Sequence, residues 1–131
     1  MRGASALQKV FEKRPDAKLK VLVVWLPVVK SDIAPPAKGV LGRLKDTRAT
    51  QFWDEKRLTS DAIFQAVAEN PKWMKPGETE LCWGQKVVWD FVAVFPEGVR
   101  WEKRIPAPDF YGFPVVEAVD GLEKRLSAGG S

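Results

Sequence analysis

The chain has 131 residues, is 45% apolar and contains six Trp, so it has enough apolar surface to fold as a single domain over residues 1–131 rather than remain disordered. No apolar run approaches the roughly 20 residues of a membrane-spanning helix, and the first residues lack the apolar core and cleavage site of a secretory signal. We therefore expect a soluble, cytoplasmic protein with no membrane association.

The net charge of +4 would suit an acidic partner such as a nucleic acid. The basic residues are, however, scattered among acidic ones along the chain, which is typical of a mixed surface and disfavours nucleic-acid binding. A single cysteine, Cys82, permits no internal disulfide, and a chain without His offers no ordinary zinc site. Gly39 and Gly42 belong to no phosphate-binding motif. We predict neither a cofactor nor a metal site.

Hydrophobic periodicity predicts the first half of the chain. Leu7, Val10 and Phe11 share one face of a helix over residues 4–13, which Pro15 ends. Residues 19–26, LKVLVVWL, form a nearly unbroken apolar run, which predicts a strand buried on both faces as in a parallel sheet. A short helix over residues 37–44 and a brief strand over residues 49–53 follow.

The second half predicts a helix over residues 59–69, with Ile63 and Ala66 among its inward residues, and an irregular loop over 72–84. Residues 86–95 form the second strong strand. A turn at 96–98 leads to an antiparallel edge strand over 99–105, and a loop over 106–112 precedes a final helix over 115–126. Residues 126–131 are expected to fray. These elements predict an α/β domain in which a mixed sheet is flanked by helices.

Several phrases of the sequence carry a family resemblance. GASALQKVF, VLVVWLPV, SDIAPP, RATQFWD and VVWDFVAVFPEGVRW together resemble a family of uncharacterised bacterial thioredoxin-like proteins, from Gly3 to about Val116. The resemblance implies a thioredoxin-like fold whose first strand is absent here. In that family the strand and a Cys-x-x-Cys pair stand just before the position of Met1, at a helix amino terminus that lowers a thiol pKa.

This chain has neither of those cysteines, so the redox chemistry of the family transfers to no residue. It also has Leu26 where an acidic residue is expected, and no proline directly before the strand at Val87. In a thioredoxin-like sheet the first strand lies between the second strand and the hairpin. Residues 19–26 must therefore pair directly with residues 86–95 or take up a strand from another chain. The other explanation for the absent first strand is a misassigned start codon.

Five residues are candidates for function, each with a structural alternative. Cys82 is a reactive thiol or a packing residue. Trp25 and Trp53 form an aromatic edge for an apolar ligand or peptide, or they fill the core. Asp54, near Glu55 and Asp61, has the character of a turn or helix cap, but it borders that edge. Asp90 lies inside an apolar strand, where three interpretations are open: it pairs with an Arg or a backbone donor, it faces solvent, or it takes part in catalysis.

The function that best fits these observations is a truncated or degenerate thioredoxin-like domain without redox catalysis, with a binding or structural role. The chain as given is then not an active enzyme. The alternative is a thiol-disulfide oxidoreductase whose complete product starts upstream and carries the cysteine pair. The expected partner is another protein, or a second copy of the chain, bound through an unpaired sheet edge.

Overall fold

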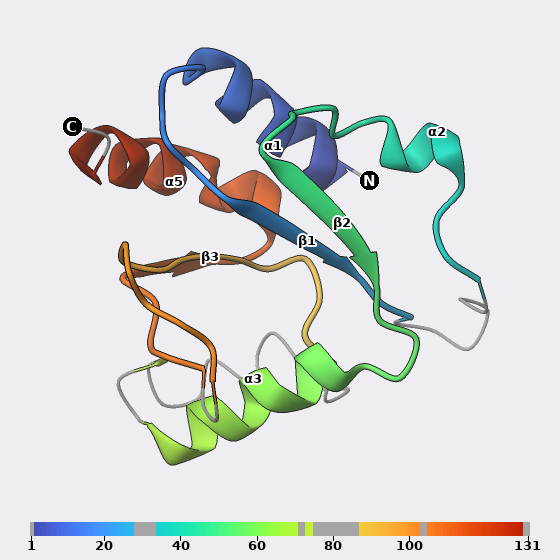
Figure 1. Cartoon of the computed structure of the whole chain (residues 1–131), viewed down its shortest axis with the longest axis vertical. Helices are drawn as coiled ribbons and strands as arrows, with labels where there is room; N and C mark the ends of the chain where they lie inside the picture. Colours follow the sequence, from blue (N-terminus) through green and yellow to red (C-terminus); the bar gives the residue numbers. More distant parts are fainter. Residues whose placement is uncertain (1, 28–33, 71–72, 75–86, 103–104, 130–131) are drawn as a thin grey trace.

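The computed structural model describes residues 2–27, 34–70, 73–74, 87–102 and 105–129 (Figure 1). Within these ranges the elements are α1 (Arg2–Lys13), β1 (Val21–Trp25), α2 (Lys38–Leu41), β2 (Ala49–Trp53), α3 (Leu58–Glu69), β3 (Val92–Val94), β4 (Phe110–Gly112) and α5 (Val115–Gly129). β1 and β2 pair in parallel, and β3 and β4 pair antiparallel. The mixed α/β class is confirmed, but the described strands form two separate two-stranded sheets and not one mixed sheet.

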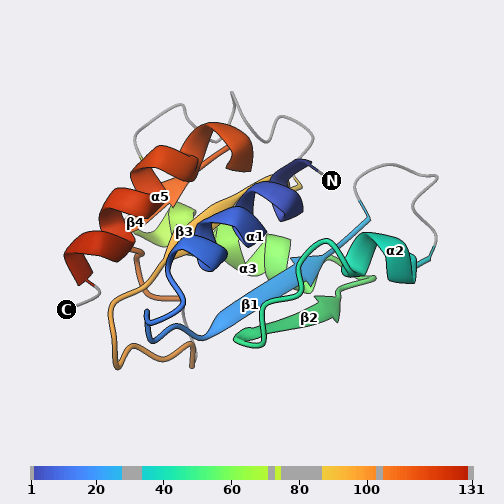
Figure 2. The same ribbon diagram turned by 90° about the horizontal axis from the view of Figure 1, so that it is seen from above.

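The elements form layers. α1 and α5 lie together on one side of the strands and α3 lies on the other side, as Figures 1 and 2 show from two directions. β1 lies between β2 and β3 in both views. The direct pairing of β1 with the strand around residue 92, one of the two sequence-based expectations, is not formed among the described residues.

The first core lies under α1 and α5, and we call it the α1–α5 cluster. Its buried members are Val10, Phe11, Leu44, Leu122 and Leu126. Both sheets contribute to its border, through Val21, Val23, Ala49, Val92, Val94 and Phe110. The predicted helical face of α1 is thus confirmed, because Val10 and Phe11 are the buried pair on that helix. Each such buried side chain contributes about 1.5–3 kcal/mol through the hydrophobic effect.

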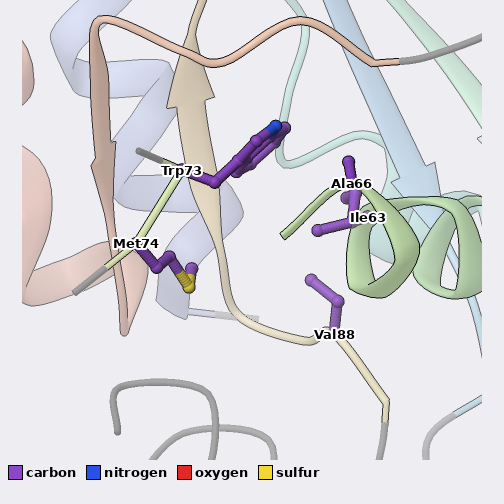
Figure 3. Packing of buried hydrophobic residues seen from close by; sticks show 5 residues of the cluster. All are labelled: Ile63, Ala66, Trp73, Met74 and Val88. Atoms are coloured by element: carbon purple, nitrogen blue, oxygen red, sulfur yellow. The ribbon is translucent and has the colours of Figure 1, made fainter. Parts of the chain in front are cut away.

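The second core lies beside α3, and we call it the α3 cluster. It joins Ile63 and Ala66 of α3 to Trp73, Met74 and Val88, whose side chains converge in Figure 3. The predicted inward face of α3 is confirmed. Ser60, which is fully buried, accepts a hydrogen bond of 2.8 Å from the backbone N–H of Val88. A buried N–H without a partner costs about 1–3 kcal/mol, so this hydroxyl fastens the chain before β3 to α3.

Arg48 holds the end of α1 against the start of β2. Its guanidinium donates hydrogen bonds to the carbonyl oxygens of Phe11 at 3.0 Å, Arg14 at 2.8 Å and Ala17 at 2.7 Å. The same group binds the Asp46 carboxylate at 2.8 and 2.7 Å and lies 5.6 Å from the centre of the Phe11 ring. Carbonyls at a helix end lack intrahelical donors. The planar guanidinium therefore supplies hydrogen-bond donors to the carbonyl oxygens at the end of α1 and in the segment that joins α1 to β1.

The second strand is much shorter than the sequence predicts. β3 covers Val92–Val94, whereas residues 86–95 were expected to be extended. Asp90 interrupts the strand because its φ is 51°, in the left-handed region that Asp tolerates better than most residues. The partner is also different: β3 pairs with Phe110–Gly112, in a segment predicted as a loop.

The predicted return strand at 99–105 is wrong for its described residues. The turn before it is confirmed, with Gly98 at a φ of 84°. Beyond that turn Val99 and Trp101 stay exposed, and Trp101 instead packs edge-on against Phe95 with ring centres 5.3 Å apart. β4 takes the pairing position instead, and its Gly112 lets α5 approach closely: a Cβ there would lie 2.5 Å from the Cβ of Ala118.

The prediction that both faces of the first strand are buried is wrong for one face. Leu22 is 56% exposed and Val24 is 36% exposed, while Val21 and Val23 border the α1–α5 cluster. The physical reason is the position of α3, which packs beside residues near β3 and β4 and not under β1. The apolar run is therefore covered on one side only by the described residues.

The remaining elements need smaller corrections. The helices around residues 4–13 and 59–69 and the brief strand at 49–53 are confirmed. The short helix expected over 37–44 is limited to Lys38–Leu41. The last helix continues past residue 126 to Gly129, so the frayed tail was placed too early. In the predicted loop at 72–84, Trp73 and Met74 are buried, and the other residues lie outside the described ranges.

Replacement of Arg48 tests the role of its guanidinium. Arg48→Lys keeps the charge but cannot reach three carbonyls and a carboxylate together. We expect the free energy of unfolding, measured by urea titration, to fall by about 1–3 kcal/mol. Arg43→Lys, at an exposed position, is the matched control and should leave stability within about 0.5 kcal/mol of the original. Equal stability of the two variants would contradict this role.

Asp46 gives the fold a defined acid sensitivity. Hydrogen bonds from Arg48 lower the pKa of the Asp46 carboxyl from 3.8 to about 2. Because the pKa is lower in the folded state, the ionised carboxylate stabilises the fold above about pH 4, and this contribution is lost as the pH falls toward about 2.

We expect Asp46→Asn to remove the stabilisation that the ionised carboxylate provides, which is about 1 kcal/mol after allowance for solvent screening. Unfolding free energies measured at several pH values should then decline less on acidification than those of the original chain. Asp16→Asn, at an exposed site, is the control and should keep the original decline. An unchanged decline in Asp46→Asn would show that other groups cause the acid sensitivity.

Candidate functional site

Trp25 and Trp53 come together at the carboxyl end of the β1–β2 sheet, where they are partners in the parallel register. The Trp25 indole N–H donates a hydrogen bond of 2.8 Å to Oε1 of Gln51. The amide nitrogen of Gln51 in turn donates to the carbonyl oxygens of Leu41 and Leu44, at 3.1 and 3.2 Å. Both tryptophans are half-buried. The indole thus ties β1 to the loop after α2.

Asp54 directly follows Trp53 and caps α3. Its carboxylate accepts hydrogen bonds from the backbone N–H groups of Leu58 at 2.9 Å and Thr59 at 2.7 Å. Its own N–H donates to the carbonyl oxygen of Trp25 at 2.7 Å, which extends the β1–β2 ladder. A carboxylate at this place also interacts favourably with the positive end of the helix dipole. The turn and cap chemistry expected for this segment is therefore present at Asp54.

Arg57 completes this edge. It has a left-handed backbone, with a φ of 58°, immediately before α3. Its Nε donates a hydrogen bond of 2.7 Å to the carbonyl oxygen of Pro27, two residues past the end of β1. The edge is therefore built from polar groups that already hold one another. It presents half-buried indole surface more than a free acid or base.

Asp90 lies elsewhere, where the amino termini of α1 and α5 meet. Asp90 is exposed, and its Oδ1 accepts a hydrogen bond of 3.0 Å from the N–H of Val115, the first residue of α5. Gly3 of α1 is so close that a Cβ there would lie 3.3 Å from the same oxygen and 3.2 Å from the Cβ of Val115. Asp90 thus has a backbone donor as its partner and caps α5.

The structure brings three of the five sequence candidates together: Trp25, Trp53 and Asp54. Asp90 is separate, and Cys82 lies outside the described residues. No group of three or more Cys, Asp or Glu side chains able to hold a metal ion occurs in the described part of the chain. The arrangement is suited to contact with another molecule through apolar and backbone groups, and it offers no pair of acid and base.

Sequence reasoning missed the outward face of the β1–β2 sheet, which we call the open face. It consists of Leu22, Val24 and Phe52, and Phe52, at 49% exposed, is the register partner of Val24. Lys20 precedes them in the same phase and is exposed. Two polar residues, Lys20 and Thr50, stand in the same phase as Leu22 and Phe52, and they were the available signal that this face of the two strands is exposed.

Comparisons with known proteins give no further assignment. No protein-family model, curated protein or solved structure matches the chain significantly. Within the described ranges, no helix has both the length and the apolar character needed to cross a bilayer.

The cap at Asp54 can be tested by truncation. Asp54→Ala removes both acceptors for the first turn of α3, and we expect it to lower the free energy of unfolding by about 1 kcal/mol. Asp54→Asn, which keeps a capping oxygen, should recover most of that loss. Glu55→Ala, at the next and exposed position, should have little effect. Chemical denaturation followed by Trp fluorescence measures the stability of all three variants. An Asp54→Ala variant as stable as the original chain would contradict the capping role of Asp54.

Proposed function

We propose that this chain is a thioredoxin-like domain, truncated or degenerate, that has no thiol-disulfide chemistry and acts by binding another protein. The observation that carries the proposal is the unpaired edge and exposed face that β1 has in the described part of the chain. This strand is hydrogen-bonded to β2 and, among the described residues, to no other strand. An apolar strand with an available edge and an exposed face is a common place for a protein partner to bind.

The open face adds side-chain area to that edge. Leu22, Val24 and Phe52 are adjacent through the β1–β2 register and are all exposed. Single exposed apolar residues are ordinary on a protein surface and need no explanation. A contiguous group of them is typical of an interaction surface. Lys20 supplies a positive charge at one end of the group. The surface therefore combines an apolar centre with a charged residue at one end.

The composition of the chain supports the non-redox part of the proposal. A dithiol cycle that closes an internal disulfide requires an attacking and a resolving cysteine, and the sequence has Cys82 alone. The sequence also has no His to serve as a base for that thiol. The dithiol cycle that the resemblance implies would need a cysteine pair that the 131 residues do not contain.

An insulin-reduction assay tests the non-redox role. We expect the chain to give no turnover above the rate of dithiothreitol alone, because it cannot form the internal disulfide of a catalytic cycle. Cys82→Ser is the matched control and should give the same trace as the original chain. Turnover that disappears in Cys82→Ser would overturn the proposal in favour of a thiol-dependent activity.

A further inference from the structure

The hydrogen bonds of β1 determine which of its residues face β2. The N–H of Val21 donates to the carbonyl oxygen of Arg48 at 3.0 Å, and the carbonyl oxygen of Trp25 accepts from Asp54 at 2.7 Å. In a parallel ladder both backbone groups of a residue point to the same neighbouring strand, and successive residues alternate. Val21, Val23 and Trp25 therefore face β2. Leu22 and Val24 direct their N–H and C=O groups to the opposite edge.

That opposite edge has no strand partner in the part of the chain that the structure describes. β3 and β4 pair only with each other there. Leu22 and Val24 thus present two donors and two acceptors at the spacing of a β-strand. An edge of this kind is a template for one more strand.

The surroundings of the edge define what that strand must be. On one side it meets the α1–α5 cluster, whose border includes Val21 and Val23 of β1. On the other side it adjoins Leu22 and Val24 of the open face. Lys20, at the amino end of β1, is exposed and has no ion pair with another described residue. An incoming strand therefore needs apolar side chains on the side of the α1–α5 cluster, and it gains from a carboxylate beside Lys20 on the side of the open face.

A second copy of the chain fits this edge poorly. β1 lies between β2 and β3 in both views (Figures 1 and 2), so the β1 edge of another copy would have to bring its own neighbouring elements with it. A single extended segment is narrower, because neighbouring strands are only about 4.8 Å apart. The arrangement favours a peptide segment over a second folded domain.

We infer that the edge of β1 formed by Leu22 and Val24 binds an extended segment of a partner protein by strand addition, with apolar side chains and an acidic residue beside Lys20. This inference rests on the proposed binding function and names the kind of partner that it needs. The segment forms main-chain hydrogen bonds to Leu22 and Val24. Its apolar side chains extend the surface of the α1–α5 cluster on one side, and its acidic residue lies with Lys20 on the side of the open face.

The probe is a synthetic peptide of sequence EVTVTV, acetylated and amidated, which has an acidic end and valines on one face. Its matched control has the same sequence with N-methyl groups on the valines, which removes backbone donors and keeps the side chains. Amide hydrogen exchange of the whole chain is followed residue by residue by NMR. Val21 and Val23, which already face β2, serve as internal references.

With saturating EVTVTV we expect exchange at Leu22 and Val24 to slow by at least about tenfold, while Val21 and Val23 change little. The N-methylated peptide should give no such protection. Lys20→Glu should weaken binding of EVTVTV and favour the peptide KVTVTV, because the charge beside the acidic end is reversed. Lys9→Glu, at an exposed position on α1, is the control for a general charge effect.

Unchanged exchange at Leu22 and Val24, or equal protection by the N-methylated peptide, would overturn strand addition. Protection at these two residues that grows with protein concentration and needs no peptide would overturn the inference in favour of a second copy. Neither result alters the insulin-reduction test. A failure of strand addition is therefore separate from a failure of the non-redox proposal.

Discussion

The fold depends on the packing of α1 against α5, because both small sheets meet beneath these two helices. β1 and β3 contribute valines to the border of the same α1–α5 cluster, yet they belong to different sheets. Main-chain hydrogen bonds normally fix the relative position of neighbouring strands. Here apolar side chains perform that task between the described strands. The pair Lys13 and Glu123, 3.3 Å apart, adds only a weak contact at the surface of the two helices.

The helices were predictable because their information is local. The spacing of Leu7, Val10 and Phe11 determines the buried face of α1 whatever else the chain does. The pairing of β3 was not predictable in this way. The extended segment starts late, at Val92, because Asp90 before it adopts a left-handed backbone and its carboxylate caps a helix that begins 25 residues later, at Val115. Periodicity within residues 86–95 contains no trace of that contact, and it also hides the close approach that Gly112 allows.

The candidate site was predictable to a similar extent. Trp25 and Trp53 end two strands, so their meeting at one edge follows once the strands pair in parallel. The capping role of Asp54 follows from its place before a helix. The exposure of Leu22 was signalled only by the polar residues Lys20 and Thr50, because the apolar run itself does not reveal which elements cover each face. That information lies in the packing of α3 beside Trp73 and Val88, distant in sequence from β1.

Arg48 also has a consequence for the order in which the chain folds. Its guanidinium binds the carbonyl oxygen of Arg14, 34 residues earlier in the sequence, so the contact closes a long loop. α1 can form before that closure, but its last carbonyls gain this donor only when β2 is in place beside β1. We therefore expect the arginine contacts to form after the rate-limiting step. Under this order they slow the unfolding of the native chain and leave the folding rate nearly unchanged.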